Sequence, residues 1–264
     1  MTELALPQED YAQRLWSKVP LVTAAFWMIK IMSTTVGETG ADLLATRLGL
    51  GLSITSWIMT GVFIVFLALQ MRAKTYVPAL YWMTVVLISV VGTLISDNLV
   101  DGFGISLKTT TIVFSAILAL VFATWYKVEG TLSIHSIVTT RREGFYWAAI
   151  LFTFALGTSA GDLVAEGFDL GYLWAANLFL LLILLTAAAY YLFNQNAVAC
   201  FWIAYVLTRP FGASVGDLLA KPNIAGGFGL GTVATSVIFL TIISGLVLYL
   251  TATRTDSEAV TGND

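Results

Sequence analysis

The chain has 264 residues, of which 58% are apolar and 11% charged, and its formal net charge is −3 at pH 7. Soluble domains carry about 25% charged residues, so this composition excludes an ordinary soluble protein and predicts a polytopic membrane protein. The thirteen basic residues form no basic face, which argues against nucleic-acid binding. Cys200 is the only cysteine and lies within an apolar run, which excludes a disulfide framework and a thiolate metal site.

Residues 1–19 mix acidic and basic side chains and lack the basic start and short apolar core of a cleaved signal, so we expect a cytosolic tail. Residues 252–264 are expected to form a second cytosolic tail. Between the tails, eight charge-poor runs of about 20 residues match the length of a helix that crosses a bilayer, and they are too uniformly apolar for barrel strands. We therefore predict a single all-α membrane domain over 20–251, with spans at about 20–45, 52–71, 77–99, 105–126, 144–166, 171–193, 197–220 and 229–251.

A frame of three residues recurs four times: a tryptophan, a glycine ten residues later and an aspartate fifteen residues later. The four copies are Trp27, Gly37 and Asp42; Trp82, Gly92 and Asp97; Trp147, Gly157 and Asp162; and Trp202, Gly212 and Asp217. They begin 55, 65 and 55 residues apart. Self-similarity of this kind indicates a repeat architecture. We therefore predict four helical hairpins at about 20–74, 75–130, 140–195 and 196–251.

Each repeat contains two spans, so all four copies insert the same way up. This predicts parallel tandem repeats with pseudo-symmetry about the membrane normal. The longer middle step suggests two pairs of hairpins, and a central ring of the odd spans follows as a hypothesis. Eight basic residues lie in the tails and in the links between repeats, against three in the turns within repeats. The positive-inside rule therefore places both termini in the cytoplasm and the aspartate ends of the odd spans outside.

A carboxylate inside a spanning helix costs about 2.5–3.5 kcal/mol, so the four frame aspartates are expected to face protein, water or an ion. Three of them have a second acid four residues away on the same helix face, and these acids are Glu38, Asp101 and Glu166. Such pairs repel, and a bound cation or a shared proton would relieve the repulsion. In the fourth copy Lys221 stands at this place, so we expect Asp217 to pair with it. The candidate metal- or substrate-binding residues are Glu38, Asp42, Asp97, Asp101, Asp162, Glu166 and Asp217.

Three further groups of residues each have two interpretations. Lys30 and Arg209 lie within the first and seventh spans, where they can pair with the acids or act as counter-ions that move when a cationic substrate arrives. The four frame glycines can allow close helix packing, or they can open the helices so that backbone carbonyls bind a cation. The four frame tryptophans can anchor and pack the helices, or they can form an aromatic ring that closes a pathway or stacks an organic cation.

Four tandem copies, each with two spans and a tryptophan at a fixed place, resemble a bacterial membrane-protein family named for its repeat, the domain-of-unknown-function-347 repeat. The motif is clearest from Trp27 to Asp42, with the sequence Trp-Met-Ile-Lys-Ile-Met-Ser-Thr-Thr-Val-Gly-Glu-Thr-Gly-Ala-Asp. The resemblance covers about residues 20–251 and implies this fold and a bacterial inner membrane, and we carry over no activity from it. The later copies repeat neither Lys30 nor Glu38, which argues against four equal sites.

Our first hypothesis is a transporter or channel for a divalent cation of the Mn²⁺ or Mg²⁺ class, because hard oxygen ligands suit these ions. The runner-up is a proton-coupled carrier of a small organic cation, with the tryptophans as walls. A third hypothesis is a structural or sensory membrane protein whose acids are satisfied internally. No nucleophile or oxyanion site accompanies the acids, so we do not expect an enzyme. The expected partners are the lipid bilayer and a small cation, as substrate rather than cofactor, and the pattern is compatible with a homo-oligomer.

Overall fold

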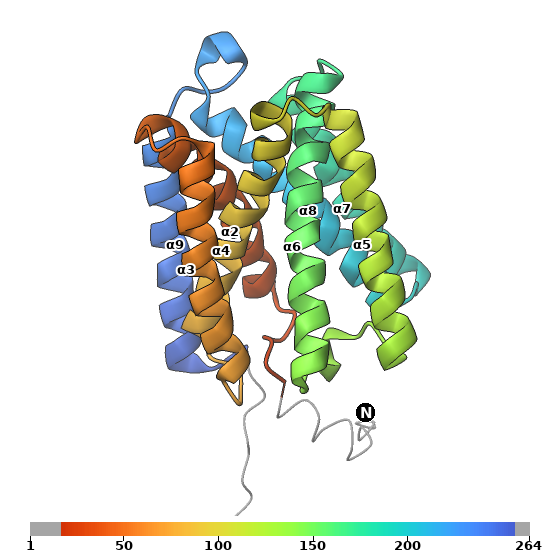
Figure 1. The fold of residues 1–264 in the computed structure, drawn as a ribbon. Coiled ribbons are helices and arrows are strands. Elements are labelled where there is room, and N and C mark those ends of the chain that lie inside the picture. The colour runs from red at the N-terminus through yellow and green to blue at the C-terminus, as the bar shows by residue number, and fades with distance from the viewer. Residues whose placement is uncertain (1–16, 257–264) are drawn as a thin grey trace, which may run out of the picture.

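The computed structural model describes residues 17–256, and within this range the chain forms eight long α-helices and no strand (Figure 1). The prediction of an all-α protein is confirmed. The helices are α2 (Ala24–Asp42), α3 (Leu52–Arg72), α4 (Pro78–Asp97), α5 (Leu107–Glu129), α6 (Thr140–Asp162), α7 (Tyr172–Phe193), α8 (Ala197–Ala220) and α9 (Thr232–Thr253). Seven of these described helices, all except α2, are long and apolar enough to cross a membrane, which supports a multi-pass membrane protein.

The predicted spans and the observed helices differ mainly at their ends. The first predicted span starts at residue 20, whereas α2 begins at Ala24. The reason is a helix cap: the Thr23 hydroxyl accepts a hydrogen bond from the Phe26 amide and satisfies one of the free N–H groups of the first turn. The predicted tails, 1–19 and 252–264, lie largely outside the described residues.

The α2 helix carries many polar residues, and most of these are buried against protein. Lys30 and Glu38 are 0% and 6% exposed. The Thr39 hydroxyl lies 2.8 Å from the hydroxyl of Ser236 on α9. A helix that is surrounded by other helices does not have to present an apolar face to lipid, so its polar composition is compatible with a central position.

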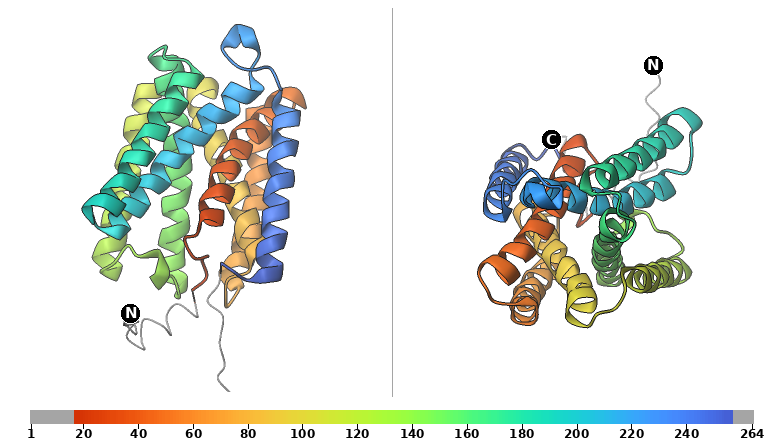
Figure 2. Two further views of the ribbon diagram at one scale, coloured as in Figure 1. Left: turned by 180° about the vertical axis from the view of Figure 1, so that it is seen from behind. Right: turned by 90° about the horizontal axis from the view of Figure 1, so that it is seen from above.

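The eight helices divide into an inner set and an outer set. The inner helices are α2, α4, α6 and α8: α2 packs against α4 and α8, and α6 packs against the same two helices. The outer helices α3, α5, α7 and α9 lie at the periphery when the bundle is seen from above (Figure 2). Burial separates the two sets, since 72% of the most apolar stretch of α4 is buried but only 11% of that of α3. The core therefore lies between the inner helices.

Each outer helix packs mainly against the inner helix of the following repeat. The α3 helix packs on α4, α5 on α6, and α7 on α8, while α9 returns to pack on α2. The sequence analysis expected each repeat to form a hairpin. In the structure, however, the two helices of one repeat do not pack closely together. A turn connects each outer helix to its own inner helix, but the outer helix makes its main contacts with the inner helix of the next repeat. The contact between α9 and α2 closes the arrangement.

Three of the inner helices end in the same local irregularity. A π-helical turn follows the frame aspartate directly in α2, α4 and α6, over Leu43–Arg47, Asn98–Gly102 and Leu163–Gly167. In contrast, α8 ends at Ala220 and is followed by a short 3-10 turn, Asn223–Ala225. Because π-helical turns are rare and concentrate at functional sites, this end of the bundle is a place to look for function.

The frame glycines lie where the inner helices cross closely. Each approaches the residue seven positions after the frame tryptophan of the next inner helix: Gly37 approaches Ser89, Gly92 Phe154, Gly157 Arg209 and Gly212 Thr34. A Cβ added to Gly92 would lie 2.5 Å from the Cβ of Phe154, and one added to Gly212 would lie 1.6 Å from the Thr34 hydroxyl oxygen. The helices continue through all four glycines. In this structure the glycines therefore provide close approach rather than helix openings.

We expect Gly92→Ala to destabilise the protein, because the added methyl group would collide with Phe154 close to the backbone of α6. Overpacking of a closely packed core costs about 1–3 kcal/mol, so the midpoint of heat unfolding in detergent should fall. Gly61→Ala on α3 is the matched control, since a Cβ at Gly61 meets no atom within 4 Å. Equal midpoints for the two variants would contradict the close crossing.

Candidate functional site

Equivalent positions of the four inner helices lie at similar levels, so the interior can be described as layers along the bundle axis. Both ends of the described chain, which are called the chain termini below, lie at the same end of the bundle (Figure 1). Because an α-helix rises 1.5 Å per residue, the frame tryptophan and frame aspartate of one helix are about 22 Å apart along that helix. From the end that holds the chain termini, the layers are aromatic residues, then the surroundings of Arg209, then the aspartates.

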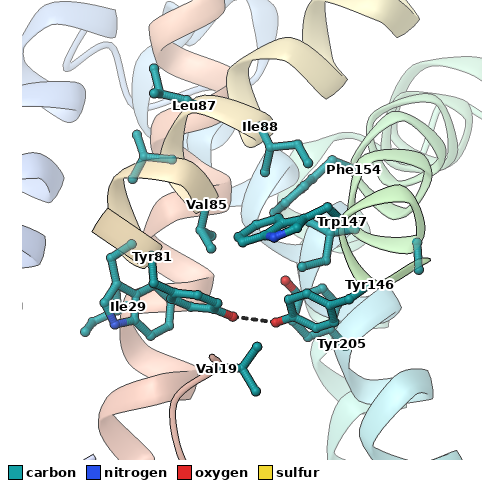
Figure 3. Close-up of a cluster of buried hydrophobic side chains, with 14 of the residues drawn as sticks. Val19, Ile29, Tyr81, Val85, Leu87, Ile88, Tyr146, Trp147, Phe154 and Tyr205 are labelled. Carbon is teal, nitrogen blue, oxygen red and sulfur yellow. Dashed lines mark hydrogen bonds between the residues drawn. The ribbon is translucent and has the colours of Figure 1, made fainter. Parts of the chain in front are cut away.

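An aromatic layer fills the axis near the chain termini. In each inner helix the residue before the frame tryptophan is aromatic, and its ring packs against the tryptophan of the next inner helix. The ring centroids are 5.6 Å apart for Phe26 and Trp82, 5.6 Å for Tyr81 and Trp147, 6.1 Å for Tyr146 and Trp202, and 5.7 Å for Phe201 and Trp27. The hydroxyl groups of Tyr81 and Tyr146 are hydrogen-bonded between α4 and α6 (Figure 3). The frame tryptophans thus pack between inner helices.

The segment before α2 lies beneath the aromatic layer. Val19 is 6% exposed and belongs to the same buried cluster as the two hydrogen-bonded tyrosines (Figure 3). Lys18 Nζ lies 2.7 Å from Glu143 Oε2 at the start of α6, and it donates to the Met71 carbonyl at the end of α3 at 2.9 Å. The segment is thus anchored to two helices and adds a second closure at this end of the axis.

Arg209 lies in the middle of the inner helices, and its side chain is 0% exposed. Its Nη1 donates to the Thr34 carbonyl at 3.2 Å. Its Nη2 donates to Glu38 Oε2 at 3.2 Å and to the Thr158 hydroxyl at 2.7 Å, and it also donates to the Thr93 hydroxyl. The four acceptors are called the guanidinium site below: the Thr34 carbonyl, the Glu38 carboxylate and the Thr93 and Thr158 hydroxyls.

The guanidinium site combines groups from all four inner helices. Glu38, Thr93 and Thr158 occupy the same position of the frame, eleven residues after the tryptophan, on α2, α4 and α6, and Arg209 reaches them from α8. A buried ion pair adds little stability relative to an apolar replacement, because both charges lose their hydration. Ionisable residues inside a membrane bundle are rare and usually functional. We therefore take this arrangement as the candidate site.

Lys30 contacts neutral groups, whereas one interpretation of the sequence expected it to pair with an acid. Its Nζ donates to the Tyr205 carbonyl at 3.0 Å and to the Thr208 hydroxyl at 2.6 Å. It also lies over the rings of Tyr205 and Phe154, at 4.4 Å and 5.1 Å from their centroids. No carboxylate within residues 17–256 forms an ion pair with Lys30. Lys30 thus ties α2 to α8 next to Arg209.

The frame aspartates lie on the far side of the guanidinium site from the chain termini. Asp217 is 3% exposed, and Asp42, Asp97 and Asp162 are partly buried. Glu38 lies one helical turn before the level of the four aspartates, eleven rather than fifteen residues after its frame tryptophan, so the five acids form one acidic region of the inner helices. Among the residues that the structure describes, no three histidine, cysteine or acidic side chains come together as a group that could hold a metal ion. The predicted carboxylate site for a divalent metal is thus not assembled in this structure.

The second acids of the later repeats lie at the rim of the bundle. Asp101 and Glu166 belong to π-helical turns and are exposed, because the wider turn changes which residues share a helix face. Lys221 Nζ lies 3.0 Å from Glu166 Oε1, 2.7 Å from the Tyr172 hydroxyl and 3.6 Å from Asp217 Oδ2, so the expected pairing with Asp217 is present. Burial acts to lower the pKa of Lys221, but both carboxylates and the hydroxyl outweigh it and raise this pKa above its ordinary value.

The sequence analysis missed several side chains that complete the site. Thr93 and Thr158 stand out in the sequence only as departures from Glu38, yet in the structure they accept hydrogen bonds from the same nitrogen of Arg209. The aromatic residue before each frame tryptophan recurs in all four copies at a fixed offset. That recurrence is a signal from which the aromatic layer could have been predicted.

A family model described as Repeat of Unknown Function (DUF347) matches four consecutive segments of the chain, residues 25–76, 80–131, 145–196 and 200–256. The chain therefore belongs to this family, and the predicted organisation in four repeats is confirmed. Each matched segment contains most of one inner helix and the outer helix that follows it. No curated protein and no solved structure matches the chain.

We expect Glu38→Gln and Arg209→Gln each to lower the free energy of unfolding by about 3–5 kcal/mol, because each leaves the other charge buried without its partner. The double variant should lose less than the sum of the two single losses, since neither charge then remains unpaired. Heat unfolding of the four proteins in one detergent measures this coupling. Additive losses would show that Glu38 and Arg209 do not act as a pair.

Proposed function

We propose that this member of the DUF347 repeat family is a membrane carrier for a small cation, which moves along the axis between the four inner helices. The observation that supports the proposal is the position of Arg209, whose cationic group occupies an oxygen-lined site in the middle of the bundle. Arg209 acts as a tethered cation. It neutralises Glu38 when no substrate is bound and leaves this place when the substrate arrives.

Two features of α8 support a movement of Arg209. Pro210 lies inside the helix directly after Arg209, and because proline has no amide N–H, the carbonyl of Val206 loses its helical partner. The helix is therefore weakened at the level of the site. In addition, the Arg209 Nε has no hydrogen-bond partner in the described chain, so the guanidinium group is not fully satisfied where it lies.

The two sides of Arg209 differ in a way that suits a carrier. Glu38 and the frame aspartates form an acidic region on one side, and acidic linings favour the passage of cations. On the other side, the aromatic layer and Val19 fill the axis. We infer a state that receives a cation from the side of the aspartates and is closed toward the chain termini.

The order of the helix contacts supports parallel repeats with pseudo-symmetry about the membrane normal. Three kinds of contact run from each repeat to the next and from the fourth back to the first. They are the outer helix against the next inner helix, the frame glycine against the next inner helix, and the aromatic ring against the next frame tryptophan. We further propose, from the positive-inside rule, that the termini lie in the cytoplasm of a bacterial cell and that the aspartates lie toward the outer side of its inner membrane.

Two classes of transported cation, divalent metal ions and small organic cations, are compared. Mn²⁺ and Mg²⁺ suit the carboxylates of the acidic region, but their ligands would have to gather in another conformation, because the described residues hold no such group together here. A small organic cation suits the present structure, in which a guanidinium group already occupies the central site. In both cases the acids are candidate proton carriers, so proton coupling belongs to the proposal.

Cation flux into liposomes that contain the purified protein tests the carrier function. The assay compares Mn²⁺, Mg²⁺, Ca²⁺ and guanidinium, with a pH reporter in the lumen. We expect Glu38→Gln to slow the transported cation about tenfold or more, because a hydrogen bond to a charged group contributes about 1.5–3 kcal/mol. A second variant combines Asp42→Asn, Asp97→Asn and Asp162→Asn and should also slow the flux.

Asp169→Asn is the matched control for the flux assay. Asp169 is exposed in the turn before α7 with φ 57°, a conformation that asparagine also adopts, so this variant should transport like the wild type. Wild-type protein that is folded and monodisperse but moves no cation would contradict the carrier function. It would favour the structural or sensory role, in which Glu38→Gln changes stability alone.

Labelling of introduced cysteines tests the proposed orientation. Cys200→Ser provides the background, and Lys74→Cys and Phe103→Cys are placed at exposed positions. Lys74 belongs to the connection between α3 and α4 and Phe103 to the connection between α4 and α5, and these connections lie at opposite ends of the bundle (Figure 1). A membrane-impermeant maleimide should label the Phe103→Cys variant in spheroplasts and the Lys74→Cys variant in inverted vesicles only, because positively charged links remain in the cytoplasm. The reverse pattern would place the chain termini outside.

A further inference from the structure

The guanidinium site offers one full negative charge. Of the groups in the described chain that accept hydrogen bonds from Arg209, only Glu38 carries a carboxylate, and the others are the hydroxyls of Thr93 and Thr158 and the carbonyl of Thr34. One carboxylate balances one positive charge. A divalent ion at the same place would leave an uncompensated charge in a region where unpaired charges are costly. The site itself therefore suits a monovalent cation.

The shape of the site suits a flat cation with N–H groups. Three acceptors from three different helices converge on Nη2 of Arg209, and the Thr34 carbonyl accepts from Nη1, so two nitrogens of one planar group are bound separately. The ring of Phe154 lies 5.6 Å from the Arg209 Cζ, a distance at which an aromatic ring attracts a cation. A fully methylated ammonium group has no N–H donor and would leave these acceptors without hydrogen bonds.

We propose that the transported cation is a small organic molecule with a guanidinium or amidinium group, which replaces the guanidinium group of Arg209 in this site. The inference rests on the carrier function proposed above and names its substrate class. Exchange of one planar monocation for another keeps Glu38 paired at every stage of occupancy. The large cost of a buried, unpaired carboxylate is thereby avoided.

Uptake of radiolabelled guanidinium by wild-type liposomes tests this substrate class, at millimolar concentrations that do not denature proteins. We expect saturable uptake that methylguanidinium inhibits. Tetramethylammonium carries the same charge but no N–H donor and should not inhibit. A double variant, Thr93→Val with Thr158→Val, keeps Glu38 and should raise the concentration for half-maximal uptake about tenfold, which corresponds to about 1.4 kcal/mol.

Thr241→Val is the matched control for the threonine variant. Its hydroxyl donates to the Val237 carbonyl of its own helix, on the exposed face of α9, at 2.7 Å. We expect unchanged uptake in this variant. Equal effects of the central and the peripheral substitutions would overturn the assignment of the central hydroxyls to the substrate.

Heat unfolding of the Arg209→Ala variant tests the site without transport. Removal of the side chain leaves the acceptors free, so millimolar methylguanidinium should raise the unfolding midpoint in detergent, because a ligand that binds only the folded state stabilises it. Tetramethylammonium should not. A rise of the unfolding midpoint of Arg209→Ala with methylguanidinium, combined with no guanidinium uptake by the wild type, would overturn the proposal. It would show that Arg209 only holds the helices together. The uptake assay uses the unchanged protein and decides the question even if Arg209→Ala does not fold.

The outcomes separate the substrate class from the carrier function. Flux of Mn²⁺, Mg²⁺ or protons that depends on Glu38, without uptake of guanidinium, would keep the carrier function and overturn the guanidinium proposal. Absence of flux for every cation would overturn both. Guanidinium uptake that is blocked by methylguanidinium and weakened by the central threonine variant would support both.

Discussion

The complete burial of the Arg209 guanidinium group is the constraint on which the rest of the interior depends. The side chain is 0% exposed, so protein oxygens have to replace water as acceptors for its N–H groups. These oxygens belong to α2, α4 and α6, and all three helices must therefore come within hydrogen-bond distance of one side chain of α8. The frame glycines allow this approach, because a larger residue at any of them would collide with the neighbouring helix.

The repeats share a scaffold but divide the chemistry of the site among them. Tryptophan, glycine and aspartate recur in all four copies, whereas the frame position of Glu38 carries a carboxylate once, a threonine twice and an alanine once. The frame position of Arg209 likewise carries threonine, serine and phenylalanine in the other copies. Four identical side chains around one axis would place like charges against each other. Divergence of the repeats instead yields one ion pair, completed by neutral hydroxyl groups.

The two ends of the axis are built from different chemistry. Near the chain termini, large rings from neighbouring repeats interlock and Val19 lies beneath them, so this end is closed by apolar packing. At the other end, aspartates are followed by π-helical turns in three of the four inner helices, and Asp101 and Glu166 in these turns are exposed. A charged group at the centre therefore has the acidic region on one side only. The two ends of the bundle therefore differ in their chemistry.

The sequence by itself determined that the protein is an all-helical membrane protein of four repeats, because an apolar run of about 20 residues can satisfy its backbone in lipid only as a helix. It also identified Glu38 and Arg209, since an ionisable group within such a run needs compensation. Only the tertiary structure decided which groups meet. Thr93 and Thr158 lie 116 and 51 residues from Arg209 in the chain, and each outer helix packs on the inner helix of the next repeat. Hydropathy and period are local properties of the chain, whereas the choice of partner depends on how distant helices pack against one another.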